Sequence, residues 1–303
     1  MTARRRVFPL VAVAVLGGAS VTRAQELEPR AYSPNPKGAN FVLLAYGRTQ
    51  GDVLLDSSLP FRDVTATLNS TSLLYGRTFG LFGRSASLGL GVPYAWGSMQ
   101  GAVGETFRRI TRSGLADGRL RLAVNLLGGP ALAPPEFARR RPRTTLGASL
   151  VVQAPTGQYD GTKLINLGTN RWSFKPELGV SHPRGRLYLE LYAGMWLFTT
   201  NDDFLGGQLR QQDPIGAFQA HVSYTFRPRL WLAADATYYT GGQSTLAGVA
   251  KDDRLGNSRV GLTAAFPLGR RQSLKLGWAS GVTTRIGGDF DTFSVAWQIL
   301  WFE

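Results

Sequence analysis

The feature that most constrains this chain is a residue pattern of period two, which recurs in twelve segments from Gly38 to the C-terminus. In the segment 186–193 a leucine stands at every second position, and Tyr188, Glu190 and Tyr192 stand between them. A period of two is typical of a β-strand whose two faces meet different environments. The chain has no cysteine, so disulfides do not stabilise it. A closed β-barrel would be stabilised instead by inter-strand hydrogen bonds with no free edge.

The lengths of the segments favour a barrel that crosses a membrane. Most are 11 to 15 residues long, and a tilted strand needs about 9–11 residues to cross a bilayer core. Strands of soluble proteins are shorter, with a mode near 5–6 residues. We therefore predict an all-β, antiparallel transmembrane barrel of about twelve strands, at 38–49, 64–80, 84–97, 113–127, 144–154, 170–181, 186–199, 214–226, 229–240, 257–267, 272–285 and 291–302.

The N-terminus predicts export. Arg4, Arg5 and Arg6 precede an apolar run at 7–19, and small residues follow up to Ala24. This is the pattern of a secretory signal peptide at 1–24, removed after Ala24. The apolar run has 13 residues, too few for the ~20 of a transmembrane helix. Residues 25–37 contain three prolines and predict an extended N-terminal arm, too short to be a plug domain, and 38–303 predict the barrel.

The connections between the segments alternate in length. Outer-membrane barrels have short periplasmic turns and longer external loops. We therefore place the short turns 81–83, 182–185, 227–228 and 268–271 in the periplasm, and the longer polar segments 50–63, 98–112, 155–169, 201–213 and 241–256 outside. The connection 128–143 is long and carries prolines and three arginines at 139–141. We expect it to be a periplasmic excursion with a helical turn.

The formal net charge of +14 falls to +10 when the four arginines of the predicted signal peptide are removed, since 30 basic and 20 acidic residues remain. A surplus of this size suggests nucleic acid in a cytosolic protein, but an exported chain with scattered cations does not meet nucleic acid. Anionic lipid headgroups or a cation-lined lumen fit better. The expected partners are outer-membrane lipid, a small organic solute and the barrel-assembly machinery; the oligomeric state is left open.

The parity of a strand assigns its faces, except in the first two strands, where the parity is mixed and no faces are assigned. Lipid-facing positions are predicted at Leu120, Leu122, Val124, Leu146, Leu150, Val152, Leu187, Leu189, Leu191, Phe218, Val222, Phe226, Leu274, Leu276, Trp278, Phe293, Val295, Trp297 and Ile299. Aromatic residues gather near both ends of the strands, as in the interfacial girdles of membrane barrels. The end toward the loops holds Tyr94, Trp96, Trp172, Phe174 and Tyr238, and the end toward the turns holds Phe226, Phe266 and Trp301.

The opposite parity predicts a lumen with seven basic and three acidic residues and one histidine. These candidate substrate-contacting positions are Arg119, Arg121, Arg171, Lys175, Glu177, Glu190, His221, Asp235, Arg259, Lys275 and Arg285, with the aromatic residues Tyr188, Tyr192, Trp196 and Tyr239 beside them. Such charges can set the preference of a pore for ions and orient polar cargo. They can also pair with each other and fill a narrow lumen. Both alternatives are open.

Two cross-strand pairs follow if the hairpins are symmetric. Glu177 would face Glu190, which is unfavourable unless a cation such as Lys175 lies beside one of them. His221 would face Asp235. A His–Asp pair raises the alternative of an outer-membrane enzyme that acts on lipid or on a substrate in the lumen, although no serine motif accompanies it and Ser223 is only the next inward residue.

Metal and cofactor chemistry has little support. The chain has two histidines and no spaced ligand cluster, so we expect no metal and no cofactor. Asp202–Asp203 and Asp252–Asp253 lie in predicted external loops, where weak calcium binding or simple solvation are the two options.

Several motifs resemble one family. The matching segments are Pro155–Asp160, Asn166–Gly168, Asn170–Trp172, Phe174–Glu177, Gly194–Trp196, Phe198–Thr199, Asn201–Asp202, Gln219–His221, Asp235, Tyr238–Tyr239, Gly241–Gly242, Asn257–Arg259 and Trp297–Gln298. Together they resemble the outer-membrane β-barrel family labelled "putative transporter of the meta-pathway of phenol degradation". The resemblance extends over nearly all of the predicted barrel. It implies an outer-membrane barrel that passes small, often aromatic, organic compounds, and it carries over no specific substrate residue.

We therefore predict a passive outer-membrane channel or uptake port, not an enzyme, that works by facilitated diffusion because no energy-coupling domain is visible. The alternatives are the enzyme above, a structural or adhesive barrel, and a soluble periplasmic β protein.

Overall fold

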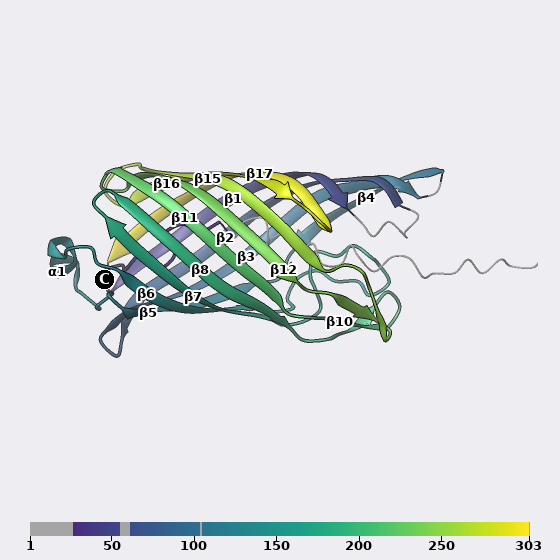
Figure 1. Ribbon diagram of the computed structural model, residues 1–303, viewed down its shortest axis with the longest axis horizontal. Coiled ribbons are helices and arrows are strands. Elements are labelled where there is room, and N and C mark those ends of the chain that lie inside the picture. Colours follow the sequence, from purple (N-terminus) through teal and green to yellow (C-terminus); the bar gives the residue numbers. More distant parts are fainter. Residues whose placement is uncertain (1–26, 55–60, 104, 303) are drawn as a thin grey trace, which may run out of the picture.

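Residues 27–54, 61–103 and 105–302 are described by the structure, a computed structural model, and they form a closed antiparallel β-barrel (Figure 1). The predicted signal peptide lies outside these residues and stays a prediction. The strands of the barrel are β1 (Ala39–Leu54), β2 (Phe61–Leu81), β3 (Arg84–Val103), β4 (Thr106–Leu115), β5 (Arg119–Leu127), β6 (Thr145–Gln153), β7 (Ser173–Arg184), β8 (Leu187–Phe198), β11 (Ile215–Arg227), β12 (Leu230–Gly241), β15 (Leu255–Pro267), β16 (Gln272–Thr283) and β17 (Gly287–Phe302).

Twelve antiparallel strand positions surround the lumen, as predicted. β4 and β5 share one position, because β4 pairs with the outer half of β3 and β5 pairs with its inner half. The barrel closes where β1 pairs with β2 on one side and with β17 on the other, in a register from Ala39↔Phe302 to Leu54↔Gly287. Every strand of the barrel except β4 pairs with a neighbour on both sides, which is what a strand-built structure in lipid requires, whereas β4 pairs with β3 alone.

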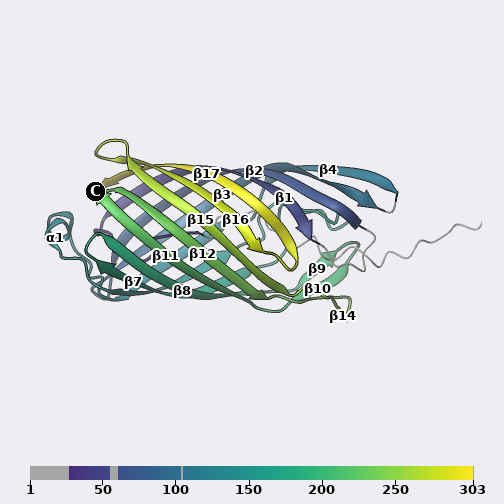
Figure 2. The same cartoon turned by 45° about the horizontal axis from the view of Figure 1, so that its top comes forward.

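The external end contains more strand than the sequence predicted. The segment 98–112, predicted to be a loop, is a β-hairpin made by the outer ends of β3 and β4, and residues 50–54 extend β1. In Figures 1 and 2 this hairpin stands beyond the rest of the barrel. The polar composition suggested loops, but the polar residues pair with neighbouring strands outside the membrane, where both faces meet water.

Two external loops fold together. They contain β9 (Asn201–Phe204) and β10 (Gln208–Gln212) from one connection, and β13 (Ser244–Leu246) and β14 (Val249–Ala250) from the other. The four strands form a second small sheet in the order β14-β13-β10-β9. In Figure 2, β9, β10 and β14 lie at the end of the barrel opposite to α1 (Pro134–Arg139).

The connection 128–143 contains the predicted helical turn. Helix α1 lies at the same end of the barrel as the C-terminus, which is the end with the short turns (Figure 1). Glu136 accepts a hydrogen bond from the backbone N–H of Ala133 at 3.1 Å, which closes the first turn of the helix. Within the described part of the chain, no helix has the length and apolar character to cross a membrane.

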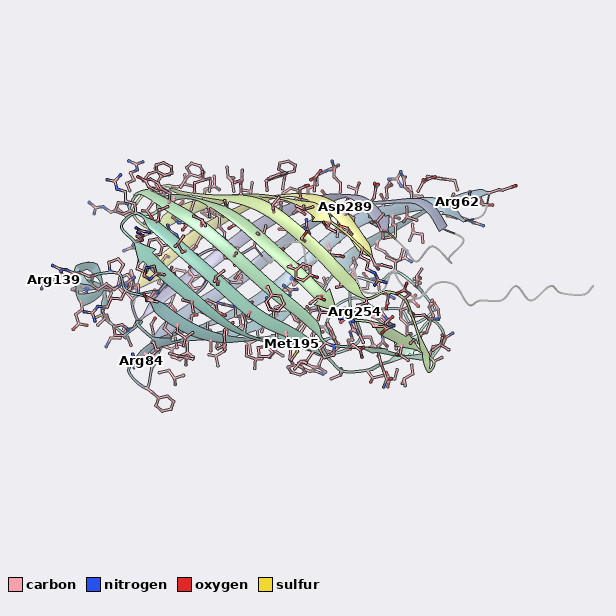
Figure 3. The ribbon with its side chains drawn as sticks, viewed as in Figure 1. Arg62, Arg84, Arg139, Met195, Arg254 and Asp289 are labelled. Atoms are coloured by element: carbon pink, nitrogen blue, oxygen red, sulfur yellow. The ribbon has the colours of Figure 1, made fainter. Side chains whose placement is uncertain are left out.

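The outer face of the barrel is apolar, as the parity predicted. Leu189, Leu191, Val222 and Phe293 are among many large apolar side chains that point away from the lumen and are exposed. The aromatic residues Tyr94, Trp96, Trp172, Tyr238, Phe226 and Phe266 are exposed on the same face. In Figure 3 the labelled charged side chains lie toward the ends, with Arg84 and Arg139 at one end and Arg62, Arg254 and Asp289 toward the other. An apolar band between charged ends is the lipid-facing surface of an outer-membrane barrel.

This surface gives a prediction for stability. Leu191 is 67% exposed on the outer face of β8. The substitution Leu191→Arg should lower the free energy of unfolding by about 2–4 kcal/mol near the midplane of the bilayer, because a guanidinium there loses its hydration. Urea unfolding of the protein in lipid vesicles would measure the loss. Leu191→Ala is the control that removes apolar surface without adding charge; equal midpoints for the two variants would contradict a lipid-facing position.

Candidate functional site in the barrel lumen

The described part of the N-terminal arm, residues 27–37, lies inside the barrel. A Cβ atom placed on Gly261 of β15 would come within 2.5 Å of Leu27 Cδ1, so Leu27 packs closely against that wall. At its other end the arm reaches the end with the short turns, where the backbone N–H of Lys37 donates to Leu132 O at 2.9 Å and the Thr78 hydroxyl donates to Pro36 O at 2.6 Å. The arm therefore crosses the lumen from one wall to another. The sequence predicted an extended arm but not this position.

Arg30 attaches the arm to β8 and β11. Its backbone N–H donates to Glu190 Oε2 at 2.8 Å, and its side chain donates to Ser223 Oγ at 3.0 Å and Thr225 Oγ1 at 2.7 Å. The guanidinium lies between two rings, 4.6 Å from the centroid of Tyr188 and 4.7 Å from that of Trp231. Stacking of this kind adds cation–π attraction to the hydrogen bonds.

Tyr32 is a second attachment point, on β6 and β7. It is 1% exposed, and its hydroxyl lies 2.9 Å from Glu177 Oε1 and 2.9 Å from Ser149 Oγ. Its ring fills a slot between two glycines, because a Cβ atom on either Gly147 or Gly179 would come within 2.2 Å of a ring carbon. Glycine inside a strand is typical of such a close approach, and this is the signal by which the slot could have been found in the sequence.

Two cavities, an outer chamber and an inner chamber, follow each other along the lumen, and Trp196 borders both of them. The outer chamber has a volume of about 210 Å³ and the inner chamber about 260 Å³. Both lie just below the 300–1,000 Å³ typical of pockets for drug-sized ligands, which fits a small organic molecule. Trp196 is 3% exposed and belongs to a cluster with Ile215 and Ala217.

The outer chamber is largely apolar. Its wall includes Leu68, Met99, Ile110, Leu167, Ile215, Tyr239, Ile286 and Phe290. Among its cations, Arg259 donates to the Phe290 carbonyl at 2.8 Å and to Thr292 Oγ1 at 3.3 Å. An apolar wall with a few fixed polar groups is the usual form of a binding site for organic ligands.

The inner chamber is basic. Arg119, Arg121, Lys175 and Lys275 line it, together with the carboxylates of Glu177 and Glu28. Glu28 belongs to the arm, and its side chain lines the same cavity as these cations.

The structure places the predicted lumen residues at different levels. Arg119, Arg121, Lys175, Glu177, Tyr192 and Lys275 line the inner chamber, and Arg259 lines the outer one. Glu190, His221 and Asp235 are buried in the wall, and Tyr188 contacts the arm through Arg30. Arg171 is buried near the outer end, where it donates to Gln212 Oε1 at 2.5 Å. Arg285 lies outside the strands, in the connection between β16 and β17, where it pairs with Asp252 at 2.6 Å.

The predicted pair of facing glutamates is wrong. Glu177 pairs in register with Gly194, and Glu190 pairs with Ser181, because β7 extends to Arg184 and the hairpin turns at Gly185–Arg186, two residues beyond the centre of the predicted turn 182–185. The cation expected beside one glutamate is present: Lys175 Nζ lies 2.9 Å from Glu177 Oε2. Glu190 accepts a hydrogen bond from the backbone N–H of Arg30 through Oε2 instead.

The predicted pairing of His221 with Asp235 is confirmed. The two residues are opposite in register, and His221 Nδ1 lies 2.7 Å from Asp235 Oδ1. Thr263 donates to Asp235 Oδ2 at 2.7 Å, and the Tyr192 ring lies 4.9 Å from the imidazole. In the described residues the Nε2 atom of His221 has no hydrogen-bond partner, and the nearby Ser223 hydroxyl accepts from Arg30 instead. The arrangement thus lacks the hydrogen bond between base and nucleophile that a hydrolase needs.

His221 can be tested as a structural residue. His221→Ala leaves one oxygen of the buried Asp235 without its partner, which should cost about 1–3 kcal/mol of the free energy of unfolding. The midpoint of urea unfolding should fall, while solute passage should be unchanged. Thr237, which is buried on the same strand as Asp235, offers Thr237→Ala as the control for loss of lumen volume. Loss of a hydrolytic activity in His221→Ala would instead support the enzyme alternative.

A buried carboxylate that the sequence analysis missed holds an external loop on the barrel. Asp117, 2% exposed, lies at the break between β4 and β5. Its oxygens accept four hydrogen bonds, from Gln153 Nε2 at 3.0 Å, from the Gly157 N–H at 2.9 Å, and from Thr169 N–H and Oγ1 at 3.0 and 2.6 Å. The loop 155–169 is thereby held so that Ile165, Asn166 and Leu167 line the outer chamber.

The same loop has its own internal turn. Asp160 accepts from Thr162 N–H at 3.0 Å and from Thr162 Oγ1 at 2.6 Å, and it pairs with Lys163 at 2.5 Å. The hydrogen bond from Lys163 and those from Thr162 hold the pKa of Asp160 well below its usual range. Asp160 ends one of the motifs on which the family resemblance depends, and Thr162 and Lys163 lie between that motif and the next.

In the residues that the structure describes, no group of three or more metal-ligating side chains comes together.

Comparison with known proteins gives a consistent result. A family model described as "Putative MetA-pathway of phenol degradation" matches residues 46–296. No curated protein sequence matches the chain significantly. The crystal structure of an outer membrane channel from Pseudomonas putida F1 is similar, with a TM-score of 0.76 and 21% identity, over 91% of this chain and 100% of that one. The β domain of the Bordetella autotransporter BrkA gives a TM-score of 0.50 and 11% identity, over 88% and 100%.

At these identities the solved structures show the fold alone, a transmembrane β-barrel. The family match extends over most of the chain. The protein therefore belongs to the family described as "Putative MetA-pathway of phenol degradation", and it is an outer-membrane β-barrel of that family.

Proposed function

We propose that the protein is a passive channel of the outer membrane that admits small organic molecules, aromatic ones among them. The observation that carries this proposal is the pair of adjoining chambers in the lumen, which share Trp196 as a common wall. A solute would enter the apolar outer chamber, pass Trp196 and reach the basic inner chamber. Movement would follow the concentration gradient.

The linings suggest how each part would act. Apolar and aromatic side chains of the outer chamber would take up a ring from water, since burial of apolar surface is favourable. In the inner chamber, Arg119, Arg121, Lys175 and Lys275 would attract polar or anionic groups, while Tyr192 and Trp196 offer ring faces. We propose these residues, with Arg259 and Tyr239 in the outer chamber, as the substrate-contacting set.

The family and the fold support a channel over an enzyme. The name of the family concerns phenol degradation, and one solved structure with the same fold is an outer membrane channel. The buried His221–Asp235 pair is the only feature raised for catalysis, and its hydroxyl neighbour Ser223 is engaged by Arg30.

Reconstitution tests the proposal. The purified full-length mature chain would be placed in planar bilayers and in liposomes, after heat-modifiable migration on a gel has shown that it is folded. We expect ion conductance and swelling of liposomes in isosmotic phenol or benzyl alcohol, with slower swelling in a sugar of larger cross-section. Folded protein that gives neither conductance nor swelling would contradict the channel function.

A further inference from the structure

The wall of the inner chamber carries more positive than negative charges. Arg119 and Arg121 come from β5, Lys175 from β7 and Lys275 from β16. The only carboxylate that the strands contribute to the chamber lining is Glu177. It forms an ion pair with Lys175 and also accepts from Gln219 at 3.3 Å and from Tyr32. Glu177 is therefore fully engaged, and Arg121 and Lys275 are the wall cations left to attract another anion.

Two of these cations are well suited to an incoming anion. Within the described part of the chain, Lys275 makes no hydrogen bond or ion pair that would hold its ammonium group in place. Arg121 stacks on the Tyr32 ring at 5.5 Å from its centroid, and its buried Nη2 atom has no hydrogen-bond partner. An anion close to these two cations gains electrostatic attraction, so the chamber favours a carboxylate over a neutral solute.

The second carboxylate in the chamber comes from the arm. Glu28 lines the chamber with Leu27 and Ala31. It lies two residues before Arg30, whose hydrogen bonds fix the arm to β8 and β11. Glu28 is thus held among the wall cations as a tethered carboxylate, with the apolar Leu27 beside it. An organic acid has the same combination of an anionic group and an apolar part.

We propose that the inner chamber is a binding site for aromatic carboxylates, and that the Glu28 carboxylate occupies it as an intramolecular competitor until such a solute displaces it. The inference rests on the proposed channel function. The rings of Tyr192 and Trp196, which border the same chamber, would contact the aromatic part of the solute, and Lys275 and Arg121 its carboxylate.

Benzoate block of the ion current tests the proposal. Wild-type protein and Glu28→Gln would be reconstituted in planar bilayers in KCl, and the half-blocking concentration of benzoate would be measured for each. Glu28→Gln removes the competing charge and should lower the half-blocking concentration of benzoate about tenfold, since one charge at close range can change an affinity by this factor. Benzyl alcohol, which keeps the ring and lacks the charge, should block both proteins equally. Lys275→Met should raise the half-blocking concentration of benzoate and leave that of benzyl alcohol unchanged.

Glu136→Gln is the matched control, because Glu136 lies on α1 outside the lumen and glutamine preserves the cap of that helix. Equal half-blocking concentrations of benzoate for wild-type protein and Glu28→Gln would overturn the proposal. A decrease in the half-blocking concentration of benzyl alcohol as large as that of benzoate would overturn it as well. Calorimetric titration of benzoate into the folded protein in detergent gives the same comparison without conduction. Absence of any current would contradict the channel function, whereas an unchanged affinity in this titration would contradict the carboxylate site alone.

Discussion

The double substitution Arg30→Ala with Tyr32→Ala should raise the single-channel conductance several-fold. The two side chains make the contacts that hold the arm across the lumen: Arg30 bonds to Ser223 and Thr225, and Tyr32 bonds to Glu177 and Ser149. Without these contacts the arm should move out of the lumen through the end of the barrel with the short turns. The cross-section of the lumen that is open to ions should then increase. Planar-bilayer recordings at fixed salt and voltage would measure the change.

Asn35→Ala is the control for this experiment, since Asn35 is an exposed residue of the same arm whose side chain makes only a 3.4 Å contact with Ser33 O. Its conductance should equal that of the wild-type protein. If the double variant also has wild-type conductance while it remains folded, the arm does not limit the flow of ions. The single variants should fall between the two extremes, because either attachment point holds part of the arm.

Asp117→Ala should release the loop 155–169 and widen the outer chamber. The substitution removes the acceptor of four hydrogen bonds, and buried donors without partners cost about 1–3 kcal/mol each. Gly157 and Gly168 allow the close contact at this point, since a Cβ atom on Gly157 would lie 2.8 Å from Asp117 Oδ1 and one on Gly168 would lie 2.6 Å from Gly157 O. We expect rapid proteolytic cleavage within the loop, while the barrel keeps its heat-modifiable migration.

Asp202→Ala provides the comparison, because Asp202 is an exposed acid on β9 at the same end of the barrel. It should leave the rate of cleavage unchanged. Liposome swelling would add a functional measurement: Asp117→Ala should admit larger solutes than the wild-type protein. A loop that stays resistant to protease after loss of Asp117 would show that the packing of Leu167 against Ala95 and Ala116 is sufficient to hold it.

The barrel could be predicted from the sequence because its determinants are local to each strand. The alternation in β8 alone separates Leu187, Leu189 and Leu191 from Tyr188, Glu190 and Tyr192, and the structure places the leucines outside. Strand length relative to the bilayer then fixes the environment. The external hairpin of β3 and β4 was predicted as a loop because its strand character depends on pairing with a neighbour, and not on its own composition.

The register of a hairpin was predictable only where the turn was placed correctly. The turn between β11 and β12 places His221 opposite Asp235 as expected. The hairpin of β7 and β8 turns at Gly185–Arg186, two residues beyond the centre of the predicted turn, so Glu177 and Glu190 do not face each other. Turn geometry sets the register, and it depends on backbone dihedral angles that residue types restrict only in part.

By itself, then, the sequence determined an outer-membrane barrel, the number of its strands and the side of each strand that meets lipid, because a period of two and a span of 11 to 15 residues are properties of single segments. The tertiary structure decided what the lumen can do. Arg30 meets Glu190 across 160 residues, Tyr32 meets Glu177 across 145, and Asp117 meets Thr169 across 52. Contacts between residues so distant in the chain form only when the barrel closes, and no local pattern encodes them.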